Sequence, residues 1–144
     1  MALTSLFGGL ALANAGLGAV HGFAGPLGGM FGGAHGAICA RLLPHVMEVN
    51  VRALQARMQD SPALQRYGEI ARILTGNGSA EADDGVAWVR DLCQALEVPS
   101  LASYGMTERD LPSVVEKSAA ASSMRGNPIE LTPEELREIL ERAS

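Results

Sequence analysis

The sequence predicts an all-α protein, a helical bundle of about seven segments in a single domain. Runs of β-branched residues with period-two alternation are absent, so no strand is expected. Apolar residues recur at helical spacing along most of the chain, and prolines, glycines and capping residues divide it into segments of helix length. With 144 residues and 47% hydrophobic content, the chain is long enough to bury one core.

The first helix is expected from Met1 to about Phe23, and it is apolar on every face. No charged residue occurs before Arg41. A helix of this kind is either part of a core or a membrane span. Several glycines and Asn14 dilute its hydrophobicity and it has no basic flanks, so we favour a helix buried in a larger protein. The lack of a basic n-region also argues against a signal peptide.

The next segment is a glycine-rich stretch between Val20 and His45 that contains all three histidines. Proline fixes φ and glycine admits positive φ, so we expect the first helix to end here and the chain to fold back. The residue pairs that predict this reversal are Gly25-Pro26, Gly28-Gly29 and Gly32-Gly33. His35 then opens a second helix to about Asn50, with a kink or a break at Pro44.

Residues 51–59 are expected to form a weakly helical connection, and four helices follow it. Each has a recognisable start, either a hydroxyl N-cap or a capping box, in two cases with proline just after the cap. The expected helices run from Ser61-Pro62 to about Leu74, from Ser79 to about Leu96, from Thr107 to about Met124, and from Thr132-Pro133 to the end. The glutamates of the last helix are expected to form a solvated face.

Charge and cysteine content restrict the classes of function. The net charge of −5 and the pI near 5.1 leave no basic surface for nucleic acid, so no such partner is expected. The two cysteines, Cys39 and Cys93, lack C-x-x-C spacing and lie among apolar residues. They are typical of reduced core thiols in a cytoplasmic protein.

His21 and His35 are the candidate metal ligands. They are 14 residues apart, which on one continuous helix would span about 21 Å, so they can share an ion only if the chain reverses between them. Neutral imidazole is a common ligand of zinc and iron, but two ligands rarely suffice, and no carboxylate lies nearby in the sequence. From the residues alone, two interpretations of this histidine pair remain open. The pair is either half of a metal site or two core histidines that bond to backbone carbonyls.

The remaining candidate residues give weaker signals. Cys39 follows His35 by one helical turn and could share its ion, but a single cysteine among apolar neighbours is more often a small buried hydrophobe, which we favour. His45 lies about 15 Å further along the helix and is expected at the surface or in packing. No phosphate-binding glycine pattern or catalytic triad is present, so no catalytic residue is predicted.

Several motifs within residues 17–47 coincide with a known metal-binding segment. They are Leu17-Gly18, His21, Pro26-Leu27-Gly28, Phe31, His35-Gly36 and Leu43-Pro44-His45-Val46-Met47. In their spacing and order they resemble the metal-binding segment of the iron-containing alcohol dehydrogenases. The resemblance extends through Gly126-Asn127-Pro128 to the last helix and so covers essentially the whole chain.

The resemblance implies the helical C-terminal domain of the dehydroquinate synthase-like fold. His21 and His35 would be the last two of four ligands of a divalent metal, Fe²⁺ or alternatively Zn²⁺. The other two ligands and the domain that binds NAD or NADP would lie outside this chain, and Met1, which has no N-cap signal, would fall within a domain. Gly25 stands where many members have a further histidine. The implied reaction interconverts small alcohols and aldehydes or ketones by hydride transfer.

Under this interpretation the isolated chain is expected to be inactive. Its expected partner is the missing nucleotide-binding portion or a second copy of itself, and no membrane is involved. Two other functions remain open. The chain could be a non-catalytic helical module that uses its uncharged first helix for self-association or binding, or a membrane-anchored helical protein.

Overall fold

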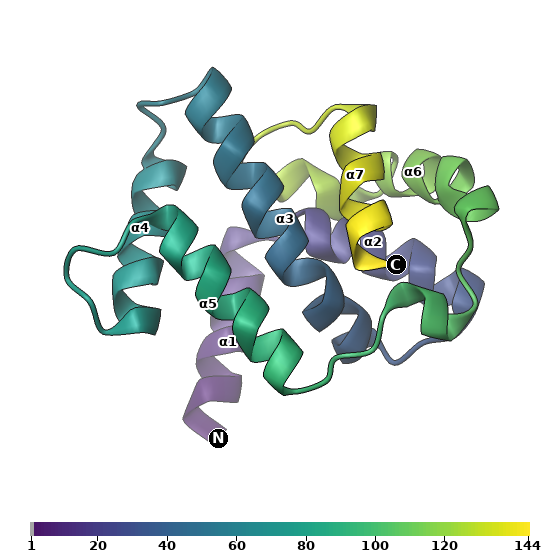
Figure 1. The fold of residues 1–144 in the computed structure, drawn as a ribbon, viewed down its shortest axis with the longest axis horizontal. Coiled ribbons are helices and arrows are strands. Elements are labelled where there is room, and N and C mark those ends of the chain that lie inside the picture. Colours follow the sequence, from purple (N-terminus) through teal and green to yellow (C-terminus); the bar gives the residue numbers. More distant parts are fainter. Residues whose placement is uncertain (1) are drawn as a thin grey trace.

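The computed structural model of the chain describes residues 2–144, which contain helices and no strand (Figure 1). The all-α prediction is therefore confirmed. The α-helices are α1 (Ala2–Ala15), α2 (Ala19–Phe31), α3 (His35–Arg57), α4 (Pro62–Thr75), α5 (Ala82–Ala95), α6 (Leu111–Ala119) and α7 (Pro133–Ala143). Three short 3₁₀ helices complete the chain: η1 (Leu101–Tyr104), η2 (Glu108–Asp110) and η3 (Ser122–Gly126).

Helix α3 is the central element, and it packs against α2, α4, α5 and α7 (Figure 1). Helix α6 packs against α2 and α7, and α4 and α5 pack against each other. The main core lies among α2, α3, α6 and α7 and includes the fully buried residues Phe23, Leu27, Ile38, Leu42, Val114, Ile139 and Leu140. A smaller cluster joins α3 to α5 through Met47, Val51, Val86 and Val89.

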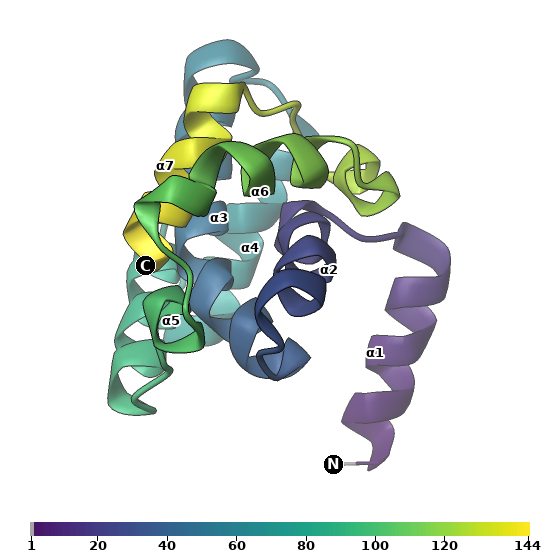
Figure 2. The same ribbon diagram turned by 90° about the vertical axis from the view of Figure 1, so that its right-hand side faces the viewer.

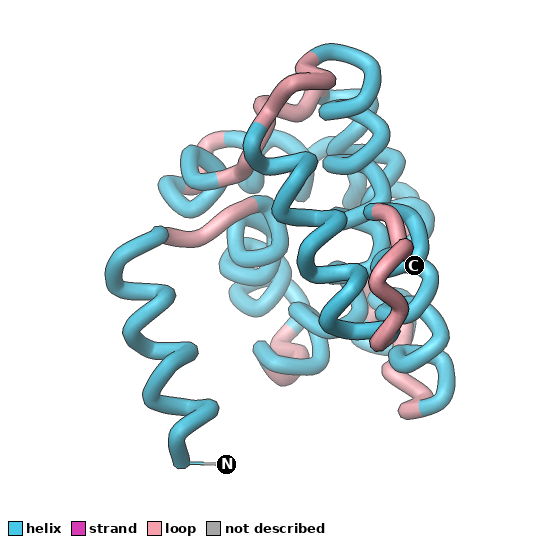
Figure 3. The backbone as a smooth tube through the Cα atoms, turned by 90° about the vertical axis from the view of Figure 1, so that its left-hand side faces the viewer, coloured by secondary structure: helices cyan, strands magenta, loops and turns pink. Residues whose placement is uncertain are grey.

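Helix α1 stands apart from the bundle, as Figures 2 and 3 show. None of its residues is buried, and its large apolar side chains are exposed: Leu3, Leu6, Phe7, Leu10 and Leu12. The expected continuous helix from Met1 to Phe23 is wrong, because the chain breaks at Gly16, which has a φ of +74°. Met1 itself lies outside the described residues. Helix α1, which the sequence predicted to be buried, is therefore exposed to solvent in this chain.

Within residues 2–144, no helix taken singly has the length and hydropathy needed to cross a bilayer. Only α1 and α2 taken together have this length and hydropathy, and the chain bends by 101° at the break between these two helices.

Helix α2 occupies most of the stretch that the glycines and Pro26 predicted to be a loop. It continues to Phe31, and the reversal occurs only at Gly32, whose φ of +68° is left-handed and whose N–H bonds to the carbonyl of Gly28. Each helical glycine costs about 1 kcal/mol relative to alanine. Burial of Phe23 and Leu27 in the main core outweighs that cost, because tertiary packing rather than propensity stabilises most helices.

Helix α3 is longer than expected and is continuous through Pro44. Proline has no N–H, so the carbonyl of Ala40 loses its helical partner. The thiol of Cys93 on α5 lies 3.4 Å from that carbonyl and donates to it. Beyond Asn50, the buried side chains of Val51 and Leu54 extend the helix through the predicted connection to Arg57.

The later helices agree with their start signals in three of four cases, because Thr107 is the N-cap of η2 and its N–H bonds to the carboxylate of Asp110. Ser61 accepts from the N–H of Ala63 and opens α4, and Thr132 and Glu135 form the predicted capping box of α7. Helix α5 begins at Ala82 rather than at Ser79, since the side chain of Asp84 accepts from the N–H of Glu81. The helix expected from Thr107 to Met124 is divided into η2, α6 and η3.

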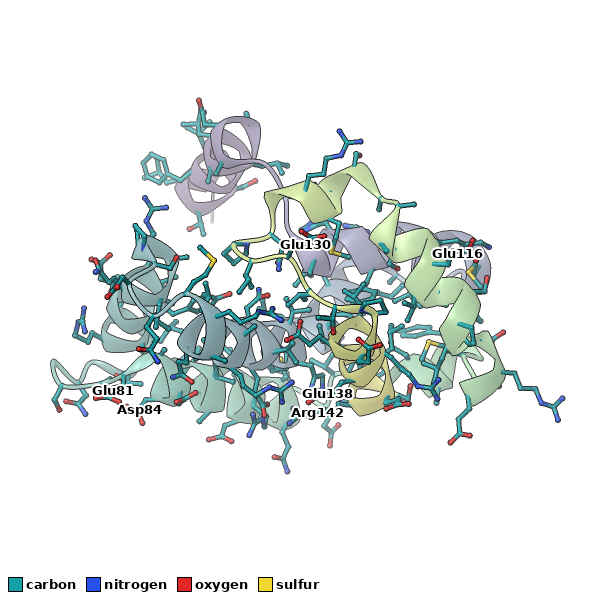
Figure 4. The ribbon with its side chains drawn as sticks, turned by 90° about the horizontal axis from the view of Figure 1, so that it is seen from above. Glu81, Asp84, Glu116, Glu130, Glu138 and Arg142 are labelled. Carbon is teal, nitrogen blue, oxygen red and sulfur yellow. The ribbon has the colours of Figure 1, made fainter. Side chains whose placement is uncertain are left out.

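Charged side chains join the helices on the outside of the bundle. Glu48 on α3 accepts hydrogen bonds from Arg90 on α5 and from Arg142 on α7, the latter at 2.8 and 2.9 Å. Glu138 lies one turn before Arg142 on α7 and is paired with it (Figure 4). Glu138 also pairs with Arg52 on α3. The glutamates of α7 are thus not only a solvated face, because two of them, Glu135 and Glu138, form ion pairs with α3.

Candidate metal centre

The first candidate ligand, His21, lies in the first turn of α2. The N-cap of this helix, Gly18, has no side chain to accept from the orphan N–H groups. Instead, the side-chain oxygen of Asn127 accepts from the N–H of Ala19 at 3.1 Å. Asn127 in turn exchanges hydrogen bonds with Asn50 of α3, which is 2% exposed and also bonds to Tyr67. A largely buried polar network therefore fixes the end of the helix that carries His21.

The link before α2 lies directly against η3. A Cβ atom added to Gly126 would come within 1.9 Å of the carbonyl oxygen of Leu17, so no side chain fits there. This close approach and the neighbouring Asn127 together hold residues 17–19 against the bundle.

The second candidate ligand, His35, is the first residue of α3, directly after the reversal at Gly32. The ring centroids of His21 and His35 are 5.4 Å apart, and the ring planes are inclined by 49°. The structure thus brings together the two histidines that the sequence singled out. The reversal that does so is made by the last glycines of the segment, not by Gly25-Pro26 or Gly28-Gly29.

Cys39 belongs to the same cluster. It lies one turn along α3 from His35, and its Sγ atom is 3.5 Å from Nε2 of that histidine. The donor atoms of His21, His35 and Cys39 all lie within 4.8 Å of one another. The sequence favoured a small buried hydrophobe at Cys39. The residue does pack against the main core, but its thiol is only half-buried, and burial raises the pKa of this thiol. The i, i+4 spacing from His35 was the signal for this third donor.

His45 does not join the cluster, in agreement with its position along the helix. Its half-buried ring lies in the charged region formed by α3, α5 and α7. Desolvation, followed by the positive charges of Arg41 and Arg142, lowers the pKa of His45 to about 4, against a smaller opposing effect of Glu48. Its Nδ1 atom is buried and has no hydrogen-bond partner among the described residues. His45 is thus a packing residue.

The cluster suits a divalent transition metal. Two imidazoles and a thiol are donors that such ions prefer, and they converge from two helices on one point. No carboxylate from residues 2–144 belongs to the cluster. An open hollow of about 610 Å³ adjoins it; His21 and Cys39 line this hollow together with Leu43, Val46 and Met47 of α3. One side of the cluster therefore faces space that a small molecule can enter.

Comparison with known proteins adds the family context. A family model described as "Fe-containing alcohol dehydrogenase family, C-terminal" matches residues 1–144. Lactaldehyde reductase of Escherichia coli strain K12 is 32% identical over 149 residues, and the match covers 99% of this chain and 37% of the reductase. The 1,3-propanediol dehydrogenase of Klebsiella pneumoniae is 31% identical over 145 residues, covering 99% of this chain and 36% of that enzyme.

Solved structures show the same helical arrangement. The crystal structure of a 1,3-propanediol oxidoreductase matches 97% of this chain with a TM-score of 0.83 and 29% identity. The iron-containing alcohol dehydrogenase from Thermococcus thioreducens matches 94% with a TM-score of 0.75 and 33% identity. These matches cover 36% and 34% of those chains, so this chain spans little more than a third of the length of its relatives.

Proposed function

We propose a function that starts from the family to which this chain belongs, the Fe-containing alcohol dehydrogenase family. The chain would be the helical part of an NAD(P)-dependent alcohol oxidoreductase. It would contribute His21 and His35 as two ligands of a divalent metal. The observation that carries the proposal is the approach of these two rings to 5.4 Å between centroids, across 14 residues of sequence. Fe²⁺ is the metal that the family description favours, and Zn²⁺ is the alternative.

In this reaction the chain's own residues would hold the metal ion, exclude water and receive the substrate. When bound, a divalent metal supplies Lewis-acid stabilisation of negative charge on the substrate oxygen. His21, fixed by the start of α2, and His35, at the start of α3, would hold that ion by donating imidazole lone pairs. The apolar side chains of Leu43, Val46 and Met47 line the adjoining hollow, and they would exclude water and receive the carbon chain of a small alcohol or aldehyde.

The nicotinamide nucleotide would be bound outside these 144 residues, by a further portion of the same enzyme or by another chain. Hydride transfer is the chemistry of that cofactor, and the helical part contributes substrate orientation and a dry site. We therefore expect no NAD(P)-dependent alcohol oxidation from the 144-residue chain alone. Two free thiols favour a cytoplasmic location.

Metal titration of the purified chain tests the ligand assignment. We expect the wild-type chain to bind one equivalent of Zn²⁺ in calorimetry, and His21→Ala or His35→Ala to weaken binding about 100-fold or more, since even outer-shell changes cost 10- to 100-fold. His45→Gln is the matched control, because this third histidine is outside the cluster, and it should bind as the wild type does. Binding that is indifferent to His21 and His35 would refute the assignment.

A second candidate function is self-association through α1. No residue of this helix is buried, and its exposed side chains include Leu6, which is 56% exposed, and Phe7, which is 62% exposed. Two copies of the chain could cover these apolar surfaces against each other. Sedimentation velocity tests this candidate: the wild-type chain should form dimers that Leu6→Glu dissociates. A monomer at every concentration measured would exclude this function.

A further inference from the structure

We infer that Cys39 is a third metal ligand, and that His21, His35 and Cys39 form a site which binds zinc, in preference to iron, with donors from this chain alone. The inference rests on the proposed function in one respect, namely that His21 and His35 hold a metal. It goes beyond that proposal by adding a thiolate and by changing the preferred ion.

The distances within the cluster suit a tetrahedral ion. Zinc binds imidazole nitrogen at about 2.0–2.1 Å and thiolate sulfur at about 2.3 Å, which places tetrahedral nitrogen and sulfur donors about 3.5 Å apart. The Sγ atom of Cys39 and Nε2 of His35 are 3.5 Å apart. Because both residues lie on α3 at i and i+4, the helix itself sets this spacing. His21 needs only a small side-chain movement, since all donor atoms are already within 4.8 Å.

The chemistry of the donor set selects the ion. A thiolate is a soft ligand, and a mixed set of sulfur and nitrogen donors in tetrahedral geometry is typical of zinc. Three protein ligands with one open position also match the usual composition of a catalytic zinc site. His21 and Cys39 line the same hollow of about 610 Å³, so the fourth position of the ion would face the space proposed for substrate.

The two cysteines both pack against apolar residues, but they differ in their hydrogen-bonding partners. Both thiols are half-buried, but the thiol of Cys93 donates to the carbonyl of Ala40, which Pro44 leaves without a helical partner. Cys93 thus has a structural role in the backbone of α3. The hydrogen-bonding partner of Cys39 is instead the imidazole of His35, itself a metal-binding group.

Cobalt titration of the full 144-residue chain tests the inference. Co²⁺ replaces Zn²⁺ in such sites, and a bound thiolate gives a sulfur-to-cobalt charge-transfer band in the near ultraviolet. We expect this band from the wild type and from Cys93→Ser, and we expect it to vanish in Cys39→Ser. The affinity for Zn²⁺, measured by competition with a chelating dye, should fall about 100-fold or more in Cys39→Ser and stay unchanged in Cys93→Ser.

The possible outcomes separate this inference from the proposed function. Co²⁺ binding that needs His21 and His35 but shows no charge-transfer band, with unchanged affinity in Cys39→Ser, would overturn the role of Cys39 and leave the histidine ligands in place. Binding that is indifferent to both histidines would overturn both proposals. A preference for Fe²⁺ over Zn²⁺ in anaerobic competition would overturn the selectivity for zinc.

Alkylation provides a second measurement that needs no substitution of Cys39. Iodoacetamide labelling at each cysteine is followed by peptide mass spectrometry, with and without Zn²⁺. Zn²⁺ should slow the labelling of Cys39 at least tenfold in the wild type, and it should have no such effect in His35→Ala. Labelling of Cys93 should not respond to Zn²⁺ in either protein. Equal labelling of Cys39 with and without Zn²⁺ would contradict ligation by its thiolate.

Discussion

The side chain of Asn127 accepts a hydrogen bond from the backbone N–H of Ala19, which lies 108 residues earlier in the chain, at 3.1 Å. Ala19 is the first residue of α2, so Asn127 replaces the side-chain N-cap that Gly18 cannot provide. The side-chain amide N–H of Asn127 also donates to the side-chain oxygen Oδ1 of Asn50 at 2.8 Å. The side chain of Asn127 thus connects α2, α3 and the turn after η3. It contacts α2 at Ala19, two residues before His21.

We therefore predict that Asn127→Ala lowers the free energy of unfolding by about 1–3 kcal/mol. The substitution leaves the N–H of Ala19 and the buried amide of Asn50 without this partner, and unsatisfied buried polar groups cost that much. Urea denaturation measures the loss, and calorimetry with Zn²⁺ should show weaker binding because His21 is no longer held in place. The matched control is Asn77→Ala, since Asn77 is exposed and bonds only within its own turn. Equal losses in the two variants would contradict the capping role.

Gly126 gives a second prediction about the same region. Any side chain there would meet the carbonyl oxygen of Leu17, and a backbone atom cannot move aside as a flexible side chain can. Gly126→Ala should displace residues 17–19 from η3 and destabilise the chain by about 1–3 kcal/mol, the usual cost of overpacking. Gly78→Ala is the control, because an added Cβ there has no neighbour within 4 Å. A thermal melt of Gly126→Ala that coincides with that of the control would refute the close contact.

The fold class and most helix starts could be predicted from sequence because they depend on local signals. Ser61 and the pair of Thr132 and Glu135 act on their own first turns, so their capping was predictable. The helix across Gly25 and Pro26 was not, because its stability comes from Phe23 and Leu27 in a core formed by distant helices. The extension of α3 to Arg57 has the same cause, burial of Leu54, which the local sequence does not reveal.

The candidate site could be predicted only in part. His21 and His35 could be paired because the glycines between them required a reversal somewhere, although only one of the three predicted pairs, Gly32-Gly33, lies where the chain reverses. The spacing of Cys39 from His35 was visible, but its approach to His21 depends on how α2 packs on α3. The support from Asn127 could not be predicted at all, since nothing local connects it with Ala19.

Cys93 gives a third prediction, on the stability of α3 at Pro44. Its thiol is the donor to the carbonyl of Ala40 that the proline leaves unpaired. Cys93→Ala should lower the free energy of unfolding by about 0.5–1.5 kcal/mol through loss of this bond. Cys93→Ser keeps a donor of similar size and should lose less, as chemical denaturation of both variants would show. A greater loss in the serine variant than in the alanine variant would argue that packing, not donation, is the role of the thiol.

The last prediction concerns the pH dependence of stability. The pKa of His45 is lowered to about 4, first by desolvation and then by Arg41 and Arg142, whereas the unfolded chain should have the ordinary value of about 6.5. The unfolded state therefore binds more protons between these two values. The contribution of His45 to stability is complete above about pH 6.5 and is lost as the pH falls toward 4.

We expect this loss to be roughly 1–2 kcal/mol, a figure discounted for the solvent screening of a half-buried ring. Urea denaturation of the wild type and of His45→Gln from pH 8 to pH 4, with a chelator present, measures it. The glutamine variant should show a flatter profile between pH 6.5 and 4. The carboxyl of Glu138, whose pKa is lowered by its hydrogen bond with Arg52, does not obscure the comparison, because it is present in both proteins. Parallel profiles for the two proteins would mean that His45 is protonated as easily in the folded chain as in the unfolded one.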